Sequence, residues 1–326
     1  MRVLVPVNSS AEMMALNPFE YNTEFYCGYM PSWWLERYGS SGSLKRGTLS
    51  SPINNRNGAA TNVVRADELK EMVAMANRFK TSLFLAINAK HYPGFLYSDL
   101  EEYIYEIHDL GIRKVIVCDE GLMQFLSGHY PDIKISVSCL NQVTNTWSAR
   151  RMLNKGNIER VVFPRHMASH EIVSIASAVP EIDFEFFIFS NKCVYDDGHC
   201  RGIHEFTPIC QDRLKARHPI WDADRGRQAY ESFVEYCSLE EDYESKGIRC
   251  PNFSCAACLL PRIEGQSNVV SAKIAFRGHD LEKRLWMVRL ARCLLDSKKD
   301  SYAIQHLVCS TYGAARLCES GMACMC

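Results

Sequence analysis

A chain of 326 residues, 47% of them hydrophobic and 23% charged, can bury a large core, which excludes disordered, collagenous and coiled-coil proteins. Its 37 lysines and arginines nearly balance its 38 aspartates and glutamates, which argues against binding to nucleic acid or to an anionic membrane. No run approaches the roughly 20 apolar residues that cross a bilayer. The opening MRVLVPVNSS lacks the longer apolar run of an export signal, so we expect a cytoplasmic protein whose 15 cysteines stay reduced.

Short apolar runs alternate with amphipathic stretches along most of the chain. The first expected strands are residues 2–7 and 24–28, and a polar loop at 50–62 precedes an expected helix at 66–78. The alternation continues with expected strands at 82–88, 114–118, 133–138, 160–164, 184–189 and 272–276, and with expected helices at 99–110, 122–127, 146–154, 169–178 and 279–296.

Fully apolar strands that alternate with helices indicate parallel pairing, with helices covering the sheet. Seven or eight such units favour a single TIM-like (β/α)8-type barrel and leave open whether the barrel is complete or distorted. An open dinucleotide-binding sheet is the weaker alternative, because no glycine-rich phosphate loop follows an expected strand. We expect one barrel domain at 1–300, with a cysteine-rich insertion at about 190–258 and a cysteine-containing tail at 301–326.

The cysteine-rich insertion follows an expected barrel strand, and barrel active sites are built at the carboxyl ends of strands. Iron–sulfur clusters and structural zinc both need about four thiolates that converge on one point. The alternative is that these cysteines are small buried hydrophobic residues, which is the interpretation we prefer for the cysteines scattered elsewhere. The residues that could form the group are Cys193, Cys200, Cys210, Cys255 and Cys258.

A series of short motifs appears in a recognisable order from about Met1 to Asp296. They include VPVN, FYCGY, INNRNGAATNV, KISVSCLNQVTN, ERVVFPRHMASHEI, FEFFIFSNKCVYDDGHC and CAACLLPRI. In this order they resemble the collagenase-like peptidase family U32. The resemblance implies a barrel enzyme that carries a [4Fe–4S] cluster and hydroxylates without oxygen, with prephenate as the oxygen donor. The better understood relatives act on RNA pyrimidines or on ubiquinone precursors.

The resemblance also implies residue roles. The cluster ligands fall on Cys193, Cys200 and Cys255, with Cys210 as the fourth and Cys258 as the alternative fourth ligand. A bound dicarboxylate such as prephenate needs fixed cations, and arginine binds a carboxylate with two parallel hydrogen bonds. The candidate catalytic residues are Arg165 at a strand end, Arg56 in the loop after the second strand, and Glu185 and Lys273 in expected strands.

We therefore expect an iron–sulfur oxidoreductase that hydroxylates a small molecule or a peptide. The balanced charge and a chain that stops soon after the barrel argue against an RNA substrate. One alternative is a non-catalytic or partner-dependent subunit that pairs with a sister barrel as a heterodimer, or with itself as a homodimer. A metal-dependent peptidase or collagenase is the second alternative, although the chain lacks the H-E-x-x-H pattern of zinc peptidases.

Overall fold

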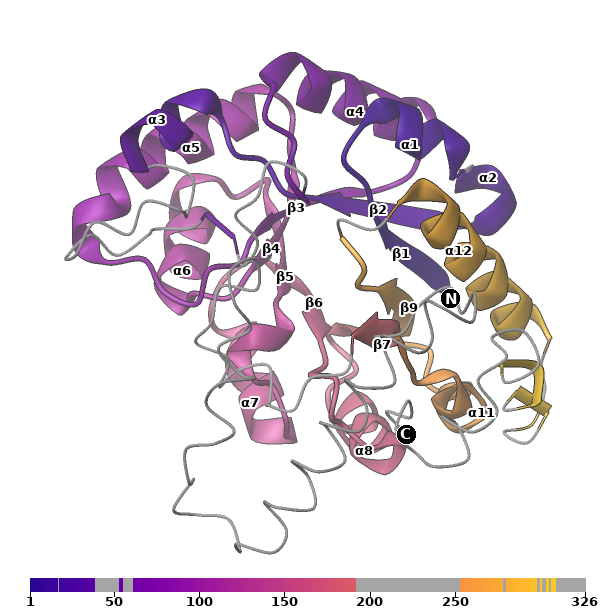
Figure 1. The fold of residues 1–326 in the computed structure, drawn as a ribbon. Coiled ribbons are helices and arrows are strands. Elements are labelled where there is room, and N and C mark those ends of the chain that lie inside the picture. Colours follow the sequence, from indigo (N-terminus) through magenta and orange to yellow (C-terminus); the bar gives the residue numbers. More distant parts are fainter. Residues whose placement is uncertain are drawn as a thin grey trace, which may run out of the picture.

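The computed structural model describes residues 1–16, 18–38, 53–54, 61–191, 253–277 and 280–297, and a few residues between 300 and 308. In this part of the chain, a ring of parallel strands surrounds the centre of the molecule and helices surround the ring (Figure 1). The strands of the ring are β1 (Arg2–Pro6), β2 (Thr23–Cys27), β3 (Leu83–Ile87), β4 (Lys114–Val117), β5 (Lys134–Val137), β6 (Ile158–Val162), β7 (Asp183–Asn191) and β9 (Val269–Ile274).

The ring is closed. Strands β1 to β7 pair in chain order, and β9 pairs with β7 on one side and with β1 on the other, always in parallel. A short strand, β8 (Phe253–Cys255), pairs antiparallel with the end of β7. The predicted TIM-like (β/α)8 barrel is therefore confirmed and complete, and the alternative of an open sheet is wrong.

Helices form the outer layer because each has one apolar face that packs on the strands. Side-chain caps begin several of them: Asp119 accepts a hydrogen bond from the backbone N–H of Leu122, and Asp280 accepts one from the backbone N–H of Lys283.

None of the described helices is long and apolar enough to cross a membrane. The helices are α1 (Ser10–Ala15), α2 (Pro18–Tyr21), α3 (Ser32–Tyr38), α4 (Ala66–Arg78), α5 (Tyr97–Asp109), α6 (Glu120–His129), α7 (Thr146–Leu153), α8 (Ser169–Ala178), α11 (Leu260–Ile263) and α12 (Leu281–Asp296).

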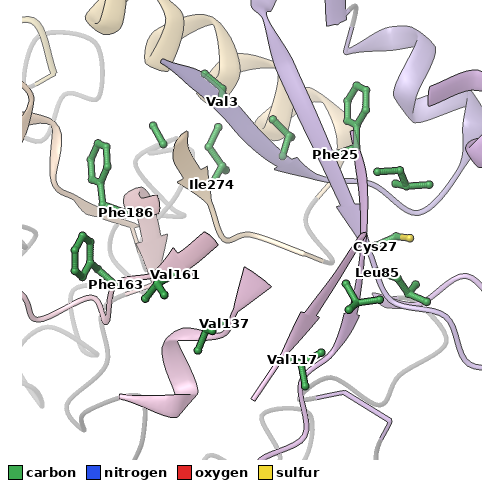
Figure 2. Packing of buried hydrophobic residues seen from close by; sticks show 14 of the residues in the cluster. Val3, Phe25, Cys27, Leu85, Val117, Val137, Val161, Phe163, Phe186 and Ile274 are labelled. Atoms are coloured by element: carbon green, nitrogen blue, oxygen red, sulfur yellow. The ribbon is translucent and has the colours of Figure 1, made fainter. Parts of the chain in front are cut away.

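The main core lies between the strands and the helices. Alternate strand residues such as Val3, Phe25 and Leu85 pack there (Figure 2). The opposite face of the strands lines the barrel interior, where Leu4, Tyr26, Phe84 and Ile116 form a small separate cluster. Several of the remaining interior positions carry charged or hydroxyl side chains. The barrel interior is thus only partly apolar.

Most expected elements agree with the structure to within a few residues. Strand β9 begins at Val269, before the expected start, because two β-branched valines open it. The short helices before residue 39 and the 3-10 helices η2 (Gly94–Leu96), η3 (Cys139–Asn141) and η5 (Ala257–Leu259) were not predicted.

Candidate functional site

Four buried charged side chains from four strands meet inside the barrel. Arg160 Nη1 donates to Glu24 Oε2 at 2.8 Å and to Glu185 Oε2 at 3.0 Å. Lys273 Nζ donates to Glu185 Oε1 at 3.0 Å. None of the four is more than 6% exposed. The structure therefore brings together two of the predicted residues, Glu185 and Lys273, and adds Arg160 and Glu24, which sequence reasoning missed.

These four side chains, with Arg2, form a chain of ion pairs that we call the barrel charge network. Arg2 donates to Glu24 Oε1 at 2.9 Å and reaches solvent at the amino-terminal end of the strands. Burial alone would raise the pKa of Glu24, but the charges and hydrogen bonds of Arg160 and Arg2 outweigh it and lower the pKa. Burial would lower the pKa of Arg160, but the two carboxylates outweigh burial and raise it. The Glu24 and Arg160 side chains are therefore both charged at neutral pH.

The lowered pKa of Glu24 predicts acid sensitivity. Ionised Glu24 contributes its full stabilisation above pH 4.5, which is the pKa of a free glutamate. This stabilisation is lost as the pH falls through the lower pKa that Glu24 has in the folded protein. We expect the wild type to lose more stability on acidification below that pH than Glu24→Gln, which has no carboxyl to protonate. Urea unfolding at a series of pH values measures both curves, and parallel curves would contradict the role assigned to Glu24.

The network ends beside two aromatic rings near the carboxyl ends of the strands. Lys273 Nζ lies 4.6 Å from the ring centre of Tyr26 and 5.7 Å from that of Phe187. The guanidinium carbon of Arg165, just after β6, lies 5.8 Å from the same Phe187 ring. Two predicted cations thus contact one aromatic side chain, an arrangement suited to a ligand with carboxylate groups. The third predicted cation, Arg56, lies outside the described residues.

A buried polar cluster adjoins this end of the barrel. Arg277, just after β9, donates from Nη2 to Asn54 Oδ1 at 2.9 Å, and Asn54 Nδ2 donates to Asn62 Oδ1 at 2.8 Å. Gly28, just after β2, leaves room for these groups. A Cβ at that position would lie 2.0 Å from Asn62 Oδ1 and 2.8 Å from Arg277 Nη1. The glycine is therefore needed for close approach of the loop to the barrel.

This contact predicts a steric penalty for Gly28→Ala. We expect the variant to lose about 1–3 kcal/mol of unfolding free energy, because the amide and guanidinium groups must move. Gly128→Ala is the matched control, because a Cβ at that helical position meets nothing within 4 Å and alanine favours helix by about 1 kcal/mol. Thermal unfolding of both variants is the measurement. Equal melting temperatures for Gly28→Ala and the wild type would contradict the packing described here.

Of the proposed cluster ligands, only Cys255 and Cys258, the alternative to Cys210 as fourth ligand, lie in the described part of the chain. Cys255 is on β8, opposite Phe189 of β7, which places it at the carboxyl end of the barrel. Its Sγ accepts a hydrogen bond from the backbone N–H of Ala257 at 3.3 Å, and both cysteines are partly buried. Backbone donors to sulfur stabilise thiolates in iron–sulfur sites. Cys255 therefore has the surroundings that a thiolate ligand of an iron–sulfur cluster needs.

The remaining predicted ligands Cys193, Cys200 and Cys210 lie outside the described residues. Within the described ranges, no three histidine, cysteine or acidic side chains gather as metal ligands would. Burial raises the pKa of the Cys27 thiol and of the Cys118 thiol to about 12. Both are therefore protonated at neutral pH, as expected for small core residues.

Fold and site together define a (β/α)8 barrel with an ion-paired interior and with cationic and cysteine side chains at the carboxyl ends of its strands. The model of Peptidase family U32 matches residues 50–297, and the chain belongs to that family. The predicted resemblance is confirmed.

Two curated relatives carry the same name, tRNA hydroxylation protein P. The protein from Helicobacter pylori strain J99 is 25% identical over 138 residues, which are 41% of this chain and 31% of the relative. The protein from Escherichia coli K12 is 26% identical over 92 residues, which are 28% of this chain and 20% of the relative. The matches therefore span no more than about a third of these relatives. A solved structure of a U32 peptidase is similar with a TM-score of 0.41 at 15% identity, over 59% of this chain and 69% of the other.

Proposed function

We propose that this protein is an oxygen-independent iron–sulfur hydroxylase and that its substrate is RNA. The observation that carries the proposal is that both named relatives are tRNA hydroxylation proteins, together with membership of the family over most of the chain. The proposal replaces the expectation of a small-molecule or peptide substrate. That expectation relied on a net charge of −1, which averages over the whole surface and does not describe any one region of it.

The proposed cofactor is a [4Fe–4S] cluster on Cys193, Cys200 and Cys255, with Cys210 as the fourth ligand and Cys258 as the alternative. Such a cluster supplies electrons and, where one iron has an exchangeable position, a Lewis acid. The hydrogen bond from Ala257 to the Cys255 sulfur supports this role, as does the position of Cys255 at the carboxyl end of the barrel.

Lys273 and Arg165 are the proposed binding residues for an anionic co-substrate, prephenate being the candidate. Their positive charges, at 5.8 Å and 5.7 Å from the centre of the Phe187 ring, support this role. Glu185 is proposed to position Lys273: its carboxylate holds the ammonium group at 3.0 Å, and Arg160 holds the carboxylate from the other side. In this proposal Glu185 does not act as a general base, because both of its oxygens already accept hydrogen bonds from cations.

Mass spectrometry of tRNA nucleosides tests the substrate. Cells that lack the gene should lose a nucleoside that carries one extra oxygen, and the wild-type gene should restore it. Restoration should fail with Lys273→Met and should be weakened by Arg165→Met. Identical nucleoside profiles with and without the gene would contradict the RNA substrate. Activity that appears only with a second family member would support the partner-dependent alternative, and chelator-sensitive peptide hydrolysis would support the peptidase alternative.

A further inference from the structure

Two aromatic side chains are exposed to solvent at the end of the barrel where the strands finish. Phe95, in η2 after β3, is 66% exposed, and Trp147, in the first turn of α7 after β5, is 80% exposed. Single exposed rings are common on protein surfaces and need no explanation. Phe95 lies in the connection between β3 and α5 and Trp147 at the start of α7, both at the same end of the barrel as Arg165. They are therefore placed where a large substrate of that site would lie.

Cations accompany both rings. Lys90 precedes Phe95 in the same connection, and Arg150 and Arg151 follow Trp147 by three and four residues on α7. Residues 145–157 carry three cations and no carboxylate.

The cations next to Trp147 also have contacts within the protein. Arg150 Nη2 donates to the backbone oxygen of Ala178 at 3.2 Å. Ala178 is the last residue of α8, so this guanidinium lies toward the amino-terminal end of the barrel, away from Trp147. Glu120 of α6 is bound by Arg151 at 2.6 Å and by Lys155 at 2.8 Å. One carboxylate is thus shared by two cations, and the surface around α7 keeps a positive charge.

We propose that the β3–α5 connection and the face of α7 that carries Trp147 form an RNA-binding rim, defined by Phe95 with Lys90 and by Trp147 with Arg151. Unpaired bases would stack on the two rings and phosphates would lie against the cations. Stacking on exposed aromatic side chains flanked by positive charge is the usual way in which proteins bind single-stranded RNA. The inference rests on the proposed RNA substrate and adds the surface that holds it.

The charges favour RNA over a protein partner at this surface. A stable protein interface buries about 800 Å² on each side around an apolar centre. Phe95 and Trp147 belong to connections two strands apart, with α6 between α5 and α7 in the outer layer (Figure 1). They are flanked by cations and do not form one apolar patch. Separate exposed rings suit successive bases along a strand.

Tyr105 provides a matched control. It is 68% exposed on α5, but its neighbours on that helix are the acids Glu101, Glu102 and Asp109. Its ring is as accessible as those of the rim, and its surroundings repel phosphate. Removal of any of these exposed rings should leave thermal stability nearly unchanged.

The test uses the anaerobically purified full chain and two labelled probes, an RNA hairpin with a single-stranded loop and a blunt RNA duplex of equal length. Fluorescence anisotropy should show that Trp147→Ala and Phe95→Ala each weaken hairpin binding by about fivefold or more, that the double variant is weaker still, and that Tyr105→Ala binds like the wild type. The duplex should bind weakly to all of them.

Hairpin binding that is equal in the wild type and the double variant would overturn the rim while leaving the RNA substrate in place. A wild type that does not bind the hairpin would overturn both. An altered oligomeric state of Trp147→Ala, with RNA affinity unchanged, would identify the surface as a protein interface and would also overturn the rim.

Discussion

Arg160→Met is expected to lower the free energy of unfolding by about 3–5 kcal/mol, since removal of one partner leaves buried charge uncompensated. Arg160 donates to both Glu24 and Glu185, and all three side chains are almost completely buried. Methionine fills a similar volume but brings no positive charge, so among the described residues the two carboxylates keep only Arg2 and Lys273 as charged partners. Urea unfolding at neutral pH measures the loss.

Arg151→Met is the matched control for that measurement. Arg151 also pairs with a glutamate, Glu120, at 2.6 Å, but its side chain is 58% exposed. Exposed ion pairs contribute about 0–1 kcal/mol, so this variant should unfold close to the wild type. If Arg160→Met were no less stable than Arg151→Met, the barrel charge network would not stabilise the fold, and its proposed role in holding Lys273 would lose its basis.

Cys255→Ser is expected to remove most of the bound iron from anaerobically purified protein, because a serine hydroxyl is a poor substitute for a thiolate ligand of a cluster. The side chain is partly buried at the carboxyl end of the barrel and its sulfur accepts a backbone hydrogen bond. Iron analysis together with the visible absorption of the cluster measures the loss.

The exposed Cys293 of α12 provides the control for this variant, and Cys293→Ser should keep its iron. Separate Cys210→Ser and Cys258→Ser variants decide the fourth ligand, because only the true ligand should behave like Cys255. A Cys255→Ser protein with wild-type iron content would remove Cys255 from the proposed set.

The barrel could be predicted because its strands are short apolar runs whose spacing leaves room for one helix between each pair. Parallel strands buried on both faces have this pattern, and runs such as KVIVC and FEFFIF carry it strongly. The early helices could not be predicted, because α1, α2 and α3 have seven residues or fewer and show too little periodicity.

The barrel charge network could be predicted only in part. Glu185 and Lys273 lie inside apolar strands, where a charge stands out, and both were selected. Glu24 and Arg160 are the first residues of the expected strands 24–28 and 160–164, where charged residues are usually solvated, and they are 136 residues apart in the sequence. Only the closure of the barrel brings them together, so no local pattern marks the pair.

Anaerobic purification with iron and sulfide analysis and visible spectroscopy tests most directly whether this protein carries the proposed iron–sulfur cluster. We expect a brown protein with about four irons and four sulfides per chain, whose colour bleaches in air. A well-folded, colourless protein without iron, prepared under strict exclusion of oxygen and still without iron after reconstitution, would contradict the account.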